Sequence, residues 1–292
     1  MKVLLTGATG YIGTSVLERL LSAGHTVTAL VRDAAKAQAV EAAGASALIG
    51  DVADSTVVST AAAAADGVIH TASTPEGDAA FIDAVLGALE GTGKPFVHTG
   101  GIWSYGSSDD ITEESPLARP ALTAWRGAGE ARVLGASGIR GMVVAPATVY
   151  GRGGGLIRLL ADATDGGVLL IGDGSQHWTT VDVDDLAALY VLALEGGRGG
   201  QAYIGASGQN PTILELGEAI ASGYGVADGV RAESVEETRA RLGEAFADAL
   251  LLDEQATGAK ARAELGWVPS ARPLVEQLAA GSYLGESVGA TR

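Results

Sequence analysis

Three glycines stand close to the N-terminus, in the segment Thr6-Gly7-Ala8-Thr9-Gly10-Tyr11-Ile12-Gly13. They follow a short apolar run and precede an amphipathic segment, a context typical of a loop that holds the pyrophosphate of a dinucleotide. Gly7 would permit a tight turn, Gly10 would let backbone amides approach the phosphates, and Gly13 would let a helix pack closely on a sheet. Because N–H groups at a helix start attract anions, the segment predicts a dinucleotide-binding site. The loop residues expected at the cofactor are Gly7, Thr9, Gly10, Tyr11, Ile12 and Gly13.

The residues about twenty positions beyond this loop distinguish NAD from NADP. They read Leu30-Val31-Arg32-Asp33. An acidic side chain there would bind the ribose hydroxyls of NAD, whereas a guanidinium suits the 2′-phosphate of NADP. Val31 occupies the position of the acid and Arg32 follows it, so we predict NADP(H), with Lys36 adding positive charge. The alternative is that Arg32 is a surface residue and that Asp33 contacts the ribose.

The elements that must position this loop follow from the hydrophobic pattern. Strands are expected at 3–6, 26–31, 47–49, 67–71, 95–99, 140–145 and 202–204. Helices are expected at 11–23, 34–43, 57–65, 78–89, 122–136 and 186–194, with a long loop over 100–121. Strands that alternate with helices predict an α/β fold, here a Rossmann-type doubly wound parallel sheet. We expect a cofactor domain over 1–150, with 179–207 returning to its sheet, and a smaller substrate-binding region over 151–178 and 208–292.

Composition excludes several classes of function. The chain of 292 residues carries a formal net charge of −16, which disfavours nucleic acid and anionic membranes as partners. It contains no cysteine, which excludes disulfides and thiolate metal sites and fits a reducing compartment. No stretch approaches the roughly 18 apolar residues of a membrane helix, and no signal peptide is evident, so we expect a cytoplasmic protein.

No metal site is expected from the sequence. His25, His70, His98 and His177 show no spacing typical of metal ligands and are interpreted as structural. Asp182, Asp184 and Asp185 precede an apolar helical segment, where carboxylates stabilise a helix start.

Further segments give nearly the whole chain a resemblance to the short-chain dehydrogenase/reductase superfamily, in its extended or atypical branch. Gly50-Asp51-Val52 resembles the family's adenine-contacting acid, and Val68-Ile69-His70-Thr71-Ala72 resembles the strand that passes the cofactor ribose. Ala145-Pro146-Ala147-Thr148-Val149-Tyr150-Gly151 resembles the segment that holds the nicotinamide amide. The resemblance adds these expected cofactor-binding residues: Asp51, Val52, Thr71, Ala72, Ser73, Pro146, Ala147, Thr148 and Val149.

The family's usual catalytic residues are missing. Its members use a tyrosine followed four positions later by a lysine, with a nearby serine, and none of the four lysines here has a tyrosine at that spacing. By resemblance, Trp125 falls at the tyrosine position and Gly129 at the lysine position, while Gly100 and Gly101 stand where the serine is expected. Thr99 is then the nearest hydroxyl and the candidate catalytic residue. Other candidate proton sources are Ser104, Tyr105, Tyr150, water and the substrate itself.

The aromatic residues suggest a flat substrate, because flat rings suit a polycyclic aromatic ligand. The expected substrate-binding residues are Gly100, Gly101, Trp103, Ser104, Tyr105, Trp125, Tyr150, Leu156, Ile157 and Trp178. The alternative is that these aromatic rings are core packing. Family members that lack the tyrosine–lysine pair include ketoreductases of aromatic polyketide pathways such as those of angucyclinones.

The resemblance therefore implies an NADPH-dependent ketoreductase of a polycyclic aromatic, quinone-like ketone in antibiotic or other secondary-metabolite biosynthesis. A phenol beside the carbonyl would let such a substrate protonate itself. Two alternatives stay open: a catalytically silent protein that senses NADP(H), and an epimerase or dehydratase of the sugar-nucleotide type, which would need a base. The expected partner is a small aromatic ketone, and the sequence does not distinguish a monomer from a dimer.

Overall fold

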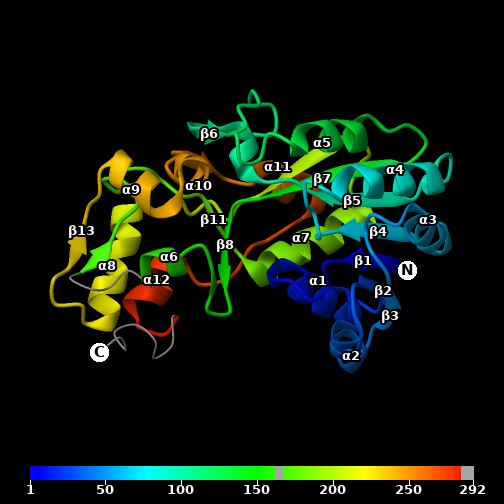
Figure 1. Ribbon diagram of the computed structural model, residues 1–292, viewed down its shortest axis with the longest axis horizontal. Coiled ribbons are helices and arrows are strands. Elements are labelled where there is room, and N and C mark those ends of the chain that lie inside the picture. Colours follow the sequence, from blue (N-terminus) through cyan, green and yellow to red (C-terminus); the bar gives the residue numbers. More distant parts are fainter. Residues whose placement is uncertain (162–166, 284–292) are drawn as a thin grey trace.

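The computed structural model describes residues 1–161 and 167–283. Within this part, the centre of the molecule is a seven-stranded sheet in the order β12-β7-β5-β4-β1-β2-β3 (Figure 1). Every neighbouring pair in it is parallel. The strands are β1 (Lys2–Thr6), β2 (Thr26–Val31), β3 (Ser46–Ile49), β4 (Gly67–His70), β5 (Pro95–Thr99), β7 (Arg140–Pro146) and β12 (Gln201–Gly205). The predicted α/β fold with a Rossmann-type parallel sheet is confirmed.

Helices cover both faces of the sheet, because successive side chains of a buried parallel strand point to opposite faces. In β1, Val3 and Leu5 join one apolar core and Leu4 joins the other. The first core includes residues of α1 (Tyr11–Ser22), α2 (Ala34–Ala42), α7 (Val183–Gly196) and α11 (Ala259–Leu265). The second includes residues of α3 (Ser55–Ala64), α4 (Asp78–Leu89) and α5 (Arg126–Gly135). The sheet is therefore buried on both sides.

A third apolar core lies beyond the carboxyl end of the sheet, at the left of Figure 1. Its helices and strands come from the later part of the chain. They are α6 (Arg158–Ala161), α8 (Ile213–Tyr224), α9 (Val235–Leu242), α10 (Glu244–Leu250), α12 (Leu274–Ala279), β10 (Val168–Leu169) and β13 (Val230–Arg231). Residues 162–166 and 284–292, which belong to the expected substrate-binding region, lie outside the described residues.

The strands of two short sheets were not predicted from the local hydrophobic pattern. The expected loop over 100–121 contains the 3₁₀ turn η1 (Ile102–Tyr105) and strand β6 (Ser108–Ile111), which pairs with β14 (Glu254–Ala256). Strand β8 (Thr148–Gly151) pairs with β11 (Thr180–Asp182) and with β9 (Gly154–Gly155). Because their partners are distant in sequence, or too short to show a period, these strands leave little local signal.

Helix α7 begins at Val183, three residues earlier than expected, and the Asp182 carboxylate caps it by accepting a hydrogen bond from the backbone N–H of Asp184. Helix α5 begins at Arg126, four residues later than expected, so that residues 122–125 form turns. Among the described residues, no helix has both the length and the apolarity that a membrane span requires.

Candidate functional site

The glycine loop joins β1 to α1 with almost no spare room. Gly7 has φ +74°, a conformation that favours glycine, and a Cβ there would lie 2.5 Å from Thr71 Oγ1. A Cβ on Gly13 would lie 1.9 Å from the carbonyl oxygen of Gly7. Helix α1 begins at Tyr11, directly after Gly10, so its free backbone N–H groups lie at this loop. The cradle fits a dinucleotide pyrophosphate, which needs close backbone approach and amide donors.

A cavity of about 540 Å³ extends from this loop across the carboxyl ends of β1 and β2. Its lining includes Gly7, Thr9, Gly10, Arg32, Lys36, Asp51, Val52, Thr71, Ala72 and Ser73, all predicted as cofactor-binding residues. Asp33 instead caps α2, because its carboxylate accepts a hydrogen bond from the Lys36 N–H at 2.8 Å. The structure thus brings together the residues predicted to bind the adenosine half of the cofactor, and the Asp33 side chain instead caps the backbone of α2.

A second cavity, of about 450 Å³, lies beside the ends of β5 and β7 and shares Thr71 and Ser73 with the first. Twelve further predicted residues line it: Tyr11, Ile12, Thr99, Gly100, Gly101, Trp103, Ser104, Pro146, Ala147, Thr148, Val149 and Leu156. Two cavities that meet at Thr71 and Ser73 suit the two halves of a dinucleotide with space for a substrate.

Several expected substrate-binding residues lie elsewhere. Trp178 is 1% exposed within the third core, and its indole N–H donates to the carbonyl oxygen of Leu250. Tyr150 is 1% exposed and donates its hydroxyl proton to the Arg272 carbonyl oxygen. Ile157 is buried in the same core, and Tyr105 is buried in the first. None of these four is among the described lining residues of the second cavity, because packing against distant helices fixes their positions.

The helix expected to carry the catalytic pair presents other residues to the cavity. Thr123 and Arg126 line it, whereas Trp125 and Gly129 do not. Gly129 packs on α4, since a Cβ there would lie 2.7 Å from Ile82 Cδ1. The Trp125 ring lies beneath the Arg126 guanidinium, 4.5 Å from its carbon. No helical spacing joins these two residues, because Thr123 lies in the turns before α5 and Arg126 is the first residue of the helix.

Thr99 lines the cavity, but its hydroxyl is committed to the protein. It donates to the His70 carbonyl oxygen at 2.7 Å and lies 2.7 Å from the hydroxyl of Tyr190, which then donates to it. Since a threonine hydroxyl has one proton, Thr99 has none to spare for a substrate oxygen. The geometry argues against Thr99 as the proton donor.

Two other hydroxyl groups of the cavity are uncommitted. Ser104 Oγ and Thr123 Oγ1 are buried and have no hydrogen-bond partner in the described part of the chain. Among the described lining residues there is no aspartate, glutamate, histidine or lysine. The ionisable lining groups are Arg126 and Tyr11, and burial raises the pKa of Tyr11 above its ordinary value. Tyr11 also donates its hydroxyl proton to the Gly151 carbonyl oxygen, so the cavity lacks an evident base.

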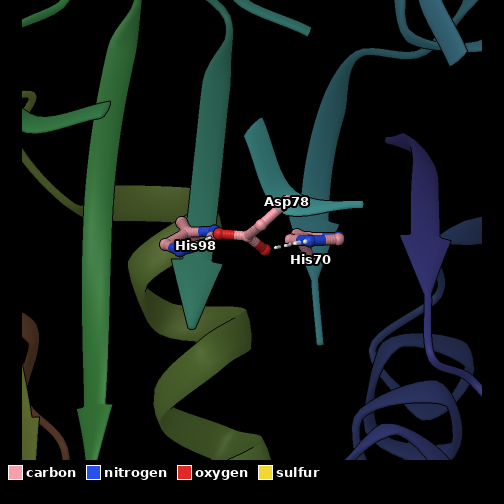
Figure 2. Close-up of side chains that lie close together, drawn as sticks. All are labelled: His70, Asp78 and His98. Atoms are coloured by element: carbon pink, nitrogen blue, oxygen red, sulfur yellow. Dashed lines mark hydrogen bonds and ion pairs between the residues drawn. The ribbon is translucent and has the colours of Figure 1, made fainter. Parts of the chain in front are cut away.

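A buried acid lies between two histidines behind this cavity (Figure 2). His70, at the end of β4, pairs in register with His98 of β5, and Asp78 of α4 reaches both. The Asp78 carboxylate lies 3.0 Å from His70 Nε2 and 3.6 Å from His98 Nε2, and it accepts a hydrogen bond from Ser73. The two histidines, expected from the sequence to be structural and to lack the spacing of metal ligands, are brought together by the parallel pairing of β4 and β5.

The protonation of this cluster follows from its burial. Burial lowers the pKa of His98 to about 3 and also lowers that of His70. Burial opposes ionisation of Asp78, but the hydrogen bond from His70 and the nearby His98 hold the pKa of Asp78 below its ordinary value. These three side chains could hold a metal ion, since their ligand atoms lie within 4.8 Å of one another. Asp78 Oδ1 accepts hydrogen bonds from His70 and Ser73, whereas neither ring nitrogen of His98 has a hydrogen-bond partner among the described residues.

Comparisons with known proteins agree with this geometry. The chain is 30% identical over 297 residues to an uncharacterized protein of Schizosaccharomyces pombe, covering 97% of this chain and all of the relative. It is 27% identical to a 2-alkyl-3-oxoalkanoate reductase of Stenotrophomonas maltophilia, over 74% of this chain and 73% of the relative.

Solved structures share the fold at low identity. A dTDP-glucose 4,6-dehydratase from Bacillus anthracis in complex with NAD aligns with a TM-score of 0.79 at 17% identity, covering 97% of this chain and 96% of the other. A human epimerase family protein with NADPH aligns with a TM-score of 0.76 at 21% identity, covering 98% and 100%. Residues 7–195, which hold the glycine loop and most of both cavities, match the family described as NAD(P)H-binding. The chain belongs to this family of NAD(P)H-binding proteins.

Proposed function

We propose that this chain is an NADP(H)-dependent ketoreductase that reduces a ketone in the cavity beside β5 and β7. The observation that carries the proposal is the pair of buried hydroxyls, Ser104 and Thr123, which line that cavity without partners among the described residues. Buried polar groups are normally hydrogen-bonded, so hydroxyls without a protein partner on residues beside a dinucleotide cradle can bind a polar ligand atom once their side chains turn toward the cavity. A carbonyl oxygen is such an atom.

The choice of NADP(H) rests on the first cavity. Arg32 and Lys36 line it, whereas Asp33, the side chain that could have bound the ribose of NAD, caps α2. A guanidinium and an ammonium suit a 2′-phosphate, because paired charges strengthen the hydrogen bonds to its oxygens.

Reduction adds a hydride with its two electrons to the carbonyl carbon and a proton to the oxygen. NADPH held at the glycine loop would supply the hydride. Ser104 and Thr123 would donate hydrogen bonds to the carbonyl oxygen as it gains negative charge, which stabilises the transition state more than the ground state. The proton would come from Ser104, from water or from a phenol of the substrate, since Thr99 and Tyr150 donate theirs to backbone carbonyls.

Fewer aromatic side chains line the substrate cavity than the sequence suggested. Of the three tryptophans expected around it, Trp103 lines the cavity, whereas Trp125 and Trp178 do not. A polycyclic aromatic ketone of a secondary-metabolite pathway stays within the proposal, supported by Trp103 and Tyr11. The name of the 2-alkyl-3-oxoalkanoate reductase supports carbonyl reduction but points to a non-aromatic ketone.

The alternatives receive less support from the cavity. An epimerase or dehydratase needs a base, and no carboxylate or imidazole is among the described lining residues. A silent sensor of NADP(H) needs no substrate cavity, yet two uncommitted hydroxyls lie beside the cofactor cradle.

NADPH consumption by the purified protein tests the proposal, measured with a panel of simple ketones, oxo acids and hydroxylated quinones. We expect turnover with at least one class, and Ser104→Ala should lower kcat by about 100-fold while leaving the Kd of NADPH unchanged. Ser137→Ala, at an exposed turn, is the matched control and should behave like the wild type. Tight NADPH binding without turnover on any ketone would favour the sensor.

A further inference from the structure

Arg126 is a cation without a close anionic partner at the edge of the second cavity. It is the first residue of α5 and lines the cavity together with Thr123. No described carboxylate lies within 4.0 Å of its guanidinium. The two acids whose charges act on Arg126 are engaged elsewhere, Asp78 with His70 and Glu130 with Arg119.

The described contacts leave most of the guanidinium unused. Its Nη1 donates to the Thr99 carbonyl oxygen at a long 3.3 Å, and its plane lies over the Trp125 ring. A guanidinium carries five N–H donors in a fixed fork. Burial lowers the pKa of Arg126, while the charges of Asp78 and Glu130 act to raise it. A partly buried cation with free donors is stabilised by an anion that enters the cavity.

The rest of the cavity limits what that anion can be. The described lining has no acidic side chain to repel it, and Ile102, Trp103 and Leu156 offer apolar surface for a hydrocarbon body. The planar fork of an arginine matches a carboxylate, with which it forms two parallel hydrogen bonds. The pyrophosphate cradle at Gly7 and Gly13 belongs to the other cavity, so a cofactor phosphate is not the expected occupant.

We propose that Arg126 binds a carboxylate of the substrate, so that the substrate class is an oxo acid: a ketone that carries a carboxylate and an apolar body. This inference rests on the proposed ketone reduction. Ser104 and Thr123 bind the oxygen of the ketone that is reduced, and Arg126 binds the two oxygens of the carboxylate. Arg126 thereby selects the substrate and fixes its orientation, without taking part in hydride or proton transfer.

Binding measurements test this assignment without any turnover. The NADP⁺-saturated protein is titrated with hexanoate and, separately, with hexanamide, which has the same chain length and no charge. We expect hexanoate to bind at least about tenfold more tightly, since its charge strengthens the hydrogen bonds with the guanidinium. Arg126→Gln should remove this preference, and Arg126→Lys should keep part of it.

The control variant is Arg132→Gln, on the same helix, where Arg132 pairs with Asp83 at the surface. It should keep the full preference for hexanoate. Equal binding of hexanoate and hexanamide to the wild type would overturn the proposal. So would an Arg126→Gln variant that loses NADP⁺ affinity but keeps the preference, since Arg126 would then serve the cofactor. Because no reaction is measured, a protein that binds hexanoate selectively but reduces no ketone would contradict the proposed function alone.

Discussion

Glu254 gives a prediction whose size follows directly from its surroundings. This side chain of β14 is 0% exposed, and neither carboxylate oxygen has a partner among the described residues. Burial, followed by the charge of Asp253, raises its pKa from 4.5 to about 9. Between these two values the folded protein keeps a proton on Glu254 that the unfolded chain has released.

The sign of the effect follows from proton linkage. Because the folded pKa is raised, the stability is full below pH 4.5, the unfolded value, and is lost as the pH rises toward 9. Each pH unit in this window lowers the free energy of unfolding by about 1.4 kcal/mol. Between pH 5 and pH 8, Glu254 should therefore remove about 4 kcal/mol of stability.

Denaturant unfolding of the wild type and of Glu254→Gln at several pH values between 5 and 8 measures this loss. The variant cannot ionise, so it should lack this part of the pH dependence and be the more stable protein at pH 8. Glu41→Gln, at an exposed position of α2, should follow the wild type. If the wild type and Glu254→Gln lose stability in parallel as the pH rises, the raised pKa is wrong.

Three further predictions concern the cofactor cradle and its support. Gly13→Ala would put a Cβ 1.9 Å from the Gly7 carbonyl oxygen, so it should abolish NADPH binding measured by fluorescence. Gly87→Ala is the control, since its Cβ meets nothing within 4 Å, and it should bind NADPH normally. Retained binding in Gly13→Ala would contradict the packing argument. Arg32→Ala should weaken NADPH by about 10- to 100-fold and NADH little, as charge-assisted hydrogen bonds are lost, and equal losses in calorimetry would refute the assignment. Thr99→Val leaves the His70 carbonyl and the Tyr190 hydroxyl without their partner, so it should lower the free energy of unfolding by about 1–3 kcal/mol. Its kcat should change less than tenfold. A loss of kcat above about 100-fold would make Thr99 the acid.

Most of the fold could be predicted because its signals are local. Buried parallel strands such as β5 and β7 are continuous apolar runs, and the glycine spacing of Gly7, Gly10 and Gly13 depends on the geometry of one turn. The residues predicted to bind the cofactor lie at the ends of such strands. All of them line one of the two cavities, apart from Gly13 of α1, which packs against the glycine loop.

The substrate half depends on contacts that a local pattern does not contain. Trp178 and Tyr150 have hydrogen-bond partners at Leu250 and Arg272, far along the chain, and these contacts draw both rings into the third core. Arg126 was not predicted, because the family pattern places the catalytic pair at Trp125 and Gly129, whereas it is Arg126, the first residue of α5, that lines the cavity. The meeting of His70 and His98 likewise follows from strand order.

The most direct test of ketone reduction follows the hydrogen itself. NADPH carrying deuterium at the transferring position of the nicotinamide is incubated with the purified protein and a 3-oxo acid, and the product is analysed by mass spectrometry. The account predicts a hydroxy acid with one deuterium on the carbinol carbon, formed by the wild type and much more slowly by Ser104→Ala. If the protein binds NADPH but transfers no deuterium to this oxo acid or to any other ketone offered, ketone reduction is contradicted.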